Sequence, residues 1–158
     1  MIVKGIVDED FINYKKPSMV IAFPNCSFKC DKECGGAVCQ NSPLAKEPNI
    51  GISYDAIIER YLNNGITKSI VLAGLEPLDS LDDVYEFLRY LRDQYHCNDD
   101  VVIYTGYNKE EITDIVNKLK WFCNIVIKYG RFIPDQQPHF DEVLGINLAS
   151  GNQYAERL

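Results

Sequence analysis

The sequence predicts a single α/β domain with a mostly parallel sheet, and three observations on the chain indicate it. Short apolar runs rich in β-branched residues alternate along the chain with segments of helical periodicity. This order implies right-handed crossovers between parallel strands. The apolar runs are continuous, as is typical of strands that are buried on both faces. The length of 158 residues suits one compact domain, so we expect residues 1–158 to form it.

Four strands are predicted from the continuous apolar runs, each bounded by turn-forming residues. They are SMVIAF (18–23), SIVLAG (69–74), DVVIYTGY (100–107) and NIVIKYG (124–130). The N-terminal MIVKGIV is a candidate for an additional strand. Residues 132–158 show no clear period, so no element is assigned there.

Three helices are predicted between these strands. They are SYDAIIERYLNNG (53–65), SLDDVYEFLRYLRDQY (80–95) and KEEITDIVNKLKWF (109–122). Apolar residues in the second segment recur at the i, i+3, i+4 spacing of one helix face, as at Leu81, Val84 and Leu88. Ser53 and Ser80 are placed to cap the first two helices, because a serine hydroxyl accepts a hydrogen bond from the free amides of the first turn.

The composition argues against some classes of partner. The net charge of −7 is unlike that of a nucleic-acid-binding protein, since phosphate contacts need a basic surface. The N-terminus lacks the apolar region of a signal peptide, and no apolar run reaches the ~20 residues of a membrane span. We therefore expect a cytoplasmic protein that binds neither nucleic acid nor a membrane.

The segment after the first predicted strand holds four of the six cysteines, which are Cys26, Cys30, Cys34 and Cys39. In a reducing compartment such a group more often binds metal than forms disulfides. The spacing C-x3-C-x3-C-x4-C lacks the C-x2-C pairs typical of structural zinc sites, although four thiolates would satisfy zinc. Thiolates also hold iron–sulfur clusters, and a cluster with three cysteine ligands leaves one iron open. Cys97 and Cys123 are expected to be partly buried apolar residues.

Distinctive residues also follow the other predicted strands. GLEP (74–77), TGY (105–107) and YGRF (129–132), like the cysteine segment, each come directly after a strand. Because ligands of parallel sheets bind at the carboxyl ends of the strands, we expect these loops to converge on one site. Each motif alone also fits an ordinary turn, as with Pro77 near a predicted helix start.

Together these motifs resemble those of the radical S-adenosylmethionine family, and more narrowly those of the small activating proteins of anaerobic ribonucleotide reductases. Five stretches match in order: the cysteine segment ending in CQN (39–41), LAGLEP (72–77), IYTGY (103–107), YGRF (129–132) and ASGNQ (149–153). The resemblance covers nearly the whole chain. It implies an incomplete TIM-like βα barrel, since a barrel of eight units needs roughly 250 residues.

A [4Fe–4S] cluster and S-adenosylmethionine are the cofactors that the resemblance implies. The cluster loop of the family has the spacing C-x3-C-x2-C, and this chain has no cysteine at the third position of that spacing. We assign the ligands as Cys26, Cys30 and Cys39, because Cys39 is followed by Gln and Asn as in the family. DKECGGAV (31–38) is then an insertion. Cys34 remains the alternative third ligand.

S-adenosylmethionine is expected to bind beside GLEP. The resemblance implies that the backbone carbonyl of Gly74 accepts a hydrogen bond from the amino group of this cofactor, and that Glu76 adds a charged acceptor. We therefore expect Gly74→Val to weaken cofactor binding more than folding. No side chain is assigned a catalytic role. The other residues expected at the cofactor are Tyr104, Thr105 and, for a carboxylate of the cofactor or partner, Lys128 or Arg131.

The implied activity is one-electron reductive cleavage of S-adenosylmethionine to methionine and a 5′-deoxyadenosyl radical. In the resembled proteins this radical takes a hydrogen atom from a glycine of the large subunit of anaerobic ribonucleotide reductase. The expected partners are that subunit, as protein substrate, and a small-protein electron donor. Two alternatives stay open: a radical enzyme acting on another glycyl-radical protein or a small molecule, and a non-catalytic zinc- or cluster-binding interaction module.

Overall fold

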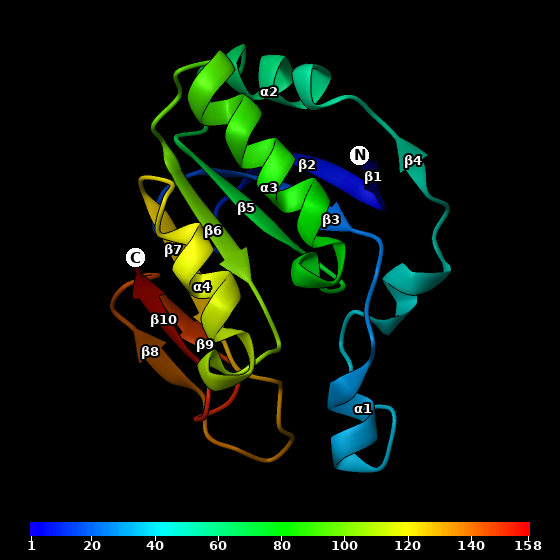
Figure 1. The fold of residues 1–158 in the computed structure, drawn as a ribbon. Helices are drawn as coiled ribbons and strands as arrows, with labels where there is room; N and C mark the ends of the chain where they lie inside the picture. Colours follow the sequence, from blue (N-terminus) through cyan, green and yellow to red (C-terminus); the bar gives the residue numbers. More distant parts are fainter.

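A computed structural model describes residues 1–158 and shows an α/β fold built on a six-stranded sheet (Figure 1). The strand order is β10-β7-β6-β5-β3-β2. In that order the strands are Tyr154–Arg157, Ile125–Tyr129, Asp100–Tyr104, Ser69–Gly74, Ser18–Phe23 and Gly5–Asp10. The four central strands β7, β6, β5 and β3 run parallel, and β10 and β2 pair antiparallel at the two edges. The parallel strands are those that the apolar runs predict.

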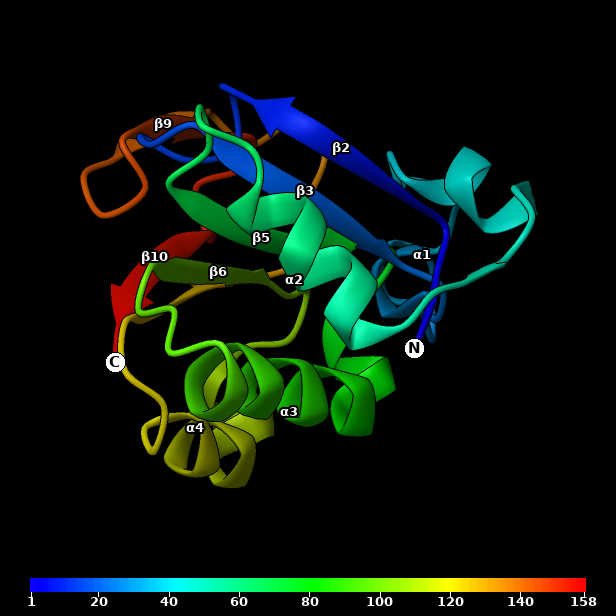
Figure 2. The same cartoon turned by 90° about the horizontal axis from the view of Figure 1, so that it is seen from above.

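Helices cover one face of this sheet and a hairpin covers the other (Figure 2). The helices on the first face are α2 (Tyr54–Leu62), α3 (Leu81–Arg89) and α4 (Thr113–Leu119). The hairpin consists of β8 (His139–Asp141) and β9 (Ile146–Leu148). Both faces of the sheet are therefore buried. In β6, for example, Val101 and Ile103 pack into the helix-side core and Val102 packs into the hairpin-side core. Burial on both faces explains the continuous apolar runs.

The ends of the helices differ from the sequence-based prediction at both ends of α3 and at the start of α4. Ser53 caps α2 as expected, since its hydroxyl accepts from the amide of Ala56. Ser80 precedes α3 but makes no capping bond, since it ends the 3-10 turn Pro77–Ser80, and the Glu76 side chain caps that turn by accepting from the Leu78 amide. Helix α3 ends at Arg89 and continues as a π-helical turn, Tyr90–Gln94. A 3-10 turn, Lys109–Ile112, precedes α4, and Asn108 and Glu111 cap it reciprocally.

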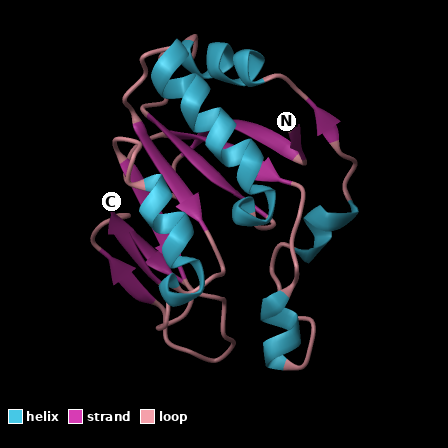
Figure 3. Ribbon diagram, viewed as in Figure 1, coloured by secondary structure: helices cyan, strands magenta, loops and turns pink.

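Three strands lie in residues 132–158, where the sequence shows no clear period. The tail contributes β8, β9 and β10, and β10 extends the main sheet. The N-terminal MIVKGIV, a candidate for an additional strand, is confirmed as strand: it forms β1 (Ile2–Val3), which pairs with β4 (Ile50–Gly51), and the start of β2. Helix α1 (Lys29–Cys34) lies in the cysteine segment, beyond the carboxyl ends of the parallel strands (Figure 3). The main sheet is open, and the barrel-like curvature expected of it stays a prediction. None of the helices has the length and apolar character of a membrane span.

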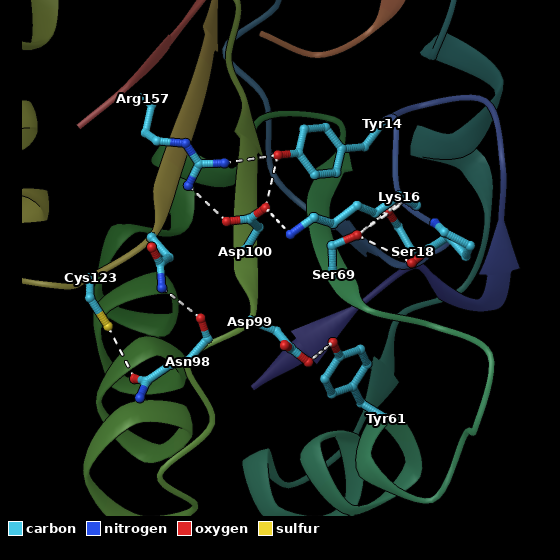
Figure 4. Close-up of polar contacts among 12 residues, drawn as sticks. Tyr14, Lys16, Ser18, Tyr61, Ser69, Asn98, Asp99, Asp100, Cys123 and Arg157 are labelled. Atoms are coloured by element: carbon cyan, nitrogen blue, oxygen red, sulfur yellow. Dashed lines mark hydrogen bonds and ion pairs between the residues drawn. The ribbon is translucent and has the colours of Figure 1, made fainter.

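Asp100 is the first residue of β6 and so lies at the end of the strand opposite the cavity loops. Figure 4 shows its polar contacts with Arg157, Tyr14 and Lys16. Its carboxylate accepts hydrogen bonds from Arg157 of β10 at 2.7 Å and from Tyr14 at 2.9 Å, and Lys16 lies 2.6 Å from it. Burial disfavours the charged carboxylate, but the bonds from Arg157, Lys16 and Tyr14 outweigh it and hold the pKa of Asp100 below its ordinary value. Through these contacts Asp100 holds the β2–β3 connection and β10 against the start of β6.

The two cysteines outside the cysteine segment, Cys97 and Cys123, differ in how far they are buried. Cys97 is buried in the helix-side core, as expected. Cys123 is exposed, and its thiol lies 3.1 Å from the side-chain oxygen of Asn98, so the expectation of partial burial is wrong there.

Candidate functional site

A cavity of about 530 Å³ lies at the carboxyl ends of the four parallel strands. Its floor is the hairpin-side face of the sheet, where side chains at alternate positions, such as Val20 and Ala22, point into it. The loops that follow the four strands form its rim. Most residues predicted for the site line it: Cys26, Cys30, Cys39, Gly74, Glu76, Tyr104, Thr105 and Lys128. Cys34 and Arg131 do not.

Three of the four loop cysteines face this cavity. Cys26, Cys30 and Cys39 are partly buried along its wall, whereas Cys34 is exposed at the end of α1. The three thiols supply the donor set that an iron–sulfur cluster takes. No group of three or more Cys, His, Asp or Glu side chains already surrounds a common point. The cysteine segment would therefore have to close around a cluster, and the donor set fits the group in kind and number.

Burial is the main influence on two of these thiols. It raises the pKa of Cys26 to about 11, with further contributions from the nearby Glu76 and Asp79 carboxylates. Burial also raises the pKa of Cys30, although a hydrogen bond from the Phe132 backbone and the charge of Arg131 lower it in part. Both thiols are consequently protonated at neutral pH in the metal-free chain, and metal binding would release protons from them.

Hydrogen bonds join the cysteine segment to the GLEP loop after β5. The side-chain amide of Asn41 donates to the backbone carbonyl of Gly74 at 2.8 Å. The amide of Glu76 donates to the carbonyl of Asn25 at 2.7 Å. The amide of Ser27 donates to the Asp79 carboxylate at 2.7 Å. Both ends of the cysteine segment are thus fixed to the same loop.

Gly74 is required by the sheet itself. Its φ is +93°, and a Cβ atom there would lie 2.8 Å from the Cα atom of Ala22 and from the amide nitrogen of Phe23. Only glycine adopts this conformation without strain and allows the backbones of β3 and β5 to approach so closely. A substitution at Gly74 therefore disturbs folding directly, and the expectation that Gly74→Val acts mainly on cofactor binding is wrong.

Glu76 connects two of the loops. One carboxylate oxygen accepts from the Leu78 amide at 3.1 Å and the other from the Gly106 amide at 2.8 Å. The side chain is buried, and burial raises its pKa to about 7 despite these bonds. Glu76 thus holds the TGY turn against the GLEP loop, a role that the sequence did not suggest.

Tyr104 and Thr105 are held by local hydrogen bonds. The Tyr104 hydroxyl donates to the backbone carbonyl of Asn13, and the Thr105 hydroxyl accepts from the Tyr107 amide at 3.0 Å. Tyr104 therefore also fixes the β2–β3 connection, in which Ile12 and Asn13 form part of the cavity wall. Both residues present side chains to the cavity in fixed orientations.

The two cations of the fourth loop have different environments. Lys128 is buried in the cavity wall, its ammonium donates to the Gly130 carbonyl at 2.9 Å, and burial lowers its pKa to about 8. Arg131 forms a two-bond ion pair with Glu111, both contacts being 2.7 Å. Lys128 is therefore the cation available to an anion in the cavity, because the guanidinium of Arg131 is already paired.

The ASGNQ stretch of the tail supports the YGRF loop. The Gln153 side chain donates to the carbonyl of Gly130 at 3.3 Å, and the Asn152 side chain donates to that of Arg131 at 2.9 Å. The tail also supplies cavity-wall residues that sequence reasoning missed, 146–148 of β9. No motif marks them, because their position depends on how the hairpin packs on the sheet.

Comparison with known proteins gives one match. A family model described as a 4Fe-4S single cluster domain matches residues 18–149. No curated protein and no solved structure matches the chain. The matched residues include the four parallel strands, the cysteine segment and the loops around the cavity.

Proposed function

This chain belongs to the family of 4Fe-4S single cluster domains, and from that premise we propose that it is a radical S-adenosylmethionine activating enzyme. Its substrate would be the large subunit of an anaerobic ribonucleotide reductase, on which it would generate a glycyl radical. The observation that supports this most is the bond between Asn41 and Gly74, because it brings the CQN and GLEP motifs to one cavity lined by three thiols.

Cys26, Cys30 and Cys39 are the proposed cluster ligands. They line the cavity, and Cys34 is exposed outside it. Three thiolate ligands leave the fourth iron of the cluster without a cysteine ligand, so it would be free to bind S-adenosylmethionine. When bound, the reduced cluster would supply the electron that cleaves the sulfonium of S-adenosylmethionine. A small-protein electron donor is the proposed source of that electron.

The residues of the chain would bind and orient S-adenosylmethionine. The carbonyl of Gly74 accepts one bond from Asn41 and keeps a second lone pair for the amino group of this ligand. The buried ammonium of Lys128 would bind its carboxylate, with the strength of a charge-assisted hydrogen bond. Tyr104 and Thr105 would contact it from the end of β6 and shield it from water.

Metal analysis and product analysis test this function. Protein reconstituted under anaerobic conditions is expected to hold about four iron atoms per chain. After reduction it should convert S-adenosylmethionine to methionine and 5′-deoxyadenosine. With a candidate anaerobic reductase from the same genome, electron paramagnetic resonance should show a glycyl doublet on the reductase. Zinc in place of iron would contradict an enzyme of this class, and cleavage without a doublet would contradict the proposed substrate.

A further inference from the structure

The eight residues between Cys30 and Cys39 form a closed loop with a defined base. The same oxygen of the Asp31 carboxylate accepts from the amides of Val38 and Cys39, both at 2.8 Å. These two bonds bring the chain back beside its starting point. Cys39 thereby reaches the cavity wall that Cys30 also lines, although the two are nine positions apart in sequence.

The backbone of Asp31 closes the loop from the other side. Its carbonyl accepts from the amide of Gly35, which ends α1, and from the amide of Gly36 at 3.1 Å. Gly35 has a φ of +69°, a conformation that glycine adopts without strain. Asp31 is therefore hydrogen-bonded to both halves of the loop, through its side chain and through its main chain.

Burial separates the base of this loop from its tip. Asp31, Val38 and Cys39 are partly buried, while residues 32–37 are all exposed. The tip contains Cys34, which lies outside the cavity. One tip residue has a charged contact elsewhere, since Glu33 lies 3.2 Å from Arg131. That Glu33 side chain is 58% exposed, so the ion pair is weak.

We propose that Asp31 is the positioning residue for Cys39, and that residues 32–37 are an insertion which the cluster site does not need. This inference rests on the proposed function for the identity of the bound group. Removing residues 32–37 leaves Asp31 and Val38 between Cys30 and Cys39, which is the spacing C-x3-C-x2-C. The bonds of Asp31 bring Cys39 back to the cavity wall that Cys26 and Cys30 line, so the longer segment also presents three thiols there.

A carboxylate suits this role for a physical reason. A charged acceptor binds two backbone amides more strongly than a neutral one, and it restrains the residue whose amide it binds. Residues that orient metal ligands through hydrogen bonds commonly change metal affinity by about tenfold or more when they are removed. Asp31 touches no cluster atom in this proposal and acts through the backbone of Cys39.

The test compares the wild type with one deletion variant and three single-substitution variants. The deletion of residues 32–37 is expected to keep the iron and sulfide content of the wild type and the resonance spectrum of its reduced cluster. Asp31→Ala is expected to weaken iron retention under chelator challenge by about tenfold with little change in melting temperature. Asp31→Asn keeps a neutral acceptor and should restore part of the loss. Glu33→Ala controls for the lost ion pair.

A readout on the metal-free chain makes the test independent of activity. Hydrogen exchange at the amides of Val38 and Cys39 should be slow in the wild type and fast in Asp31→Ala. Full iron retention in Asp31→Ala, or loss of the cluster in a folded deletion variant when Glu33→Ala keeps it, would overturn the proposal. If the deletion variant does not fold, the exchange and retention of the Asp31 variants decide the question. Zinc in the wild type would refute the proposed function but not the role of Asp31. Hydrogen exchange and metal retention in Asp31→Ala would still show whether Asp31 positions Cys39.

Discussion

The side-chain amide of Asn41 donates a 2.8 Å hydrogen bond to the backbone carbonyl of Gly74. This bond connects the end of the cysteine segment to the carboxyl end of β5, two places that lie 33 positions apart in sequence. Both lie on the cavity wall. The bond therefore fixes the distance between a proposed cluster ligand, Cys39, and the proposed binding surface for S-adenosylmethionine.

Asn41→Ala is expected to impair the site more than the fold. Without the amide, the segment around Cys39 loses its attachment to Gly74, and iron retention after reconstitution should fall several-fold. The melting temperature should change little, because Asn41 is exposed and lies outside the core. Asn63→Ala, at the end of α2 and outside the cavity, is the matched control. Equal iron retention in both variants would show that the bond has no role at the site.

Gly74→Ala should destabilise the chain by about 2 kcal/mol, because it forces a side chain into a positive-φ conformation and against the backbone of β3. Urea denaturation measures the loss. Gly51→Ala is the control, since a Cβ atom there meets nothing within 4 Å. A stability equal to that of the control would contradict the close approach of the two strands.

Glu76 should make the stability of the metal-free chain depend on pH. Burial raises its pKa from 4.5 to about 7, so the folded state holds a proton that the unfolded state has released. The free energy of unfolding should therefore fall as the pH rises from about 4.5 to about 7, by about 3 kcal/mol. Glu76→Gln should remove this slope. Urea denaturation across that pH range checks it, and parallel curves for the two proteins would contradict it.

Asp100→Ala should destabilise the end of the sheet opposite the cavity by about 2 kcal/mol, because it leaves Tyr14 and Arg157 without their acceptor. The lowered pKa of Asp100 means that its contribution is complete above its unfolded pKa and is lost as the pH falls through its folded pKa. Asp8→Ala, which removes the exposed pair with Arg60, is the control and should cost less than about 1 kcal/mol. Similar losses in both variants, measured by thermal denaturation, would contradict this account.

The sequence predicts the parallel strands well because their burial on both faces leaves a local signal, as at Val101, Val102 and Ile103. It does not reveal β10, a short strand whose only mark is its pairing with the distant β7. Ser80 shows a similar limit, since Glu76 caps the turn that leads into α3 and the Ser80 hydroxyl accepts from Asn25, which is distant in sequence. Such contacts depend on the three-dimensional arrangement and leave no local pattern.

For the candidate site, the sequence predicted which loops meet but not the hydrogen bonds that hold them together. The loops after the four strands contain distinctive residues, and the geometry of parallel sheets brings such loops together. The roles of Asn41 and Asp31 were not predictable, because each acts through a hydrogen bond to a backbone group elsewhere. The same reason applies to Glu76, whose type suggested a ligand contact but whose oxygens accept from Leu78 and Gly106.

The identity of the third ligand tests the account most directly. The measurement is the iron content of Cys34→Ala and Cys39→Ala after anaerobic reconstitution, with the wild type and Cys123→Ala beside them. Cys34 and Cys123 are both exposed, and Cys39 lines the cavity. We predict that Cys34→Ala and Cys123→Ala hold as much iron as the wild type and that Cys39→Ala loses the cluster. A cluster that survives in Cys39→Ala and is lost in Cys34→Ala would contradict the account.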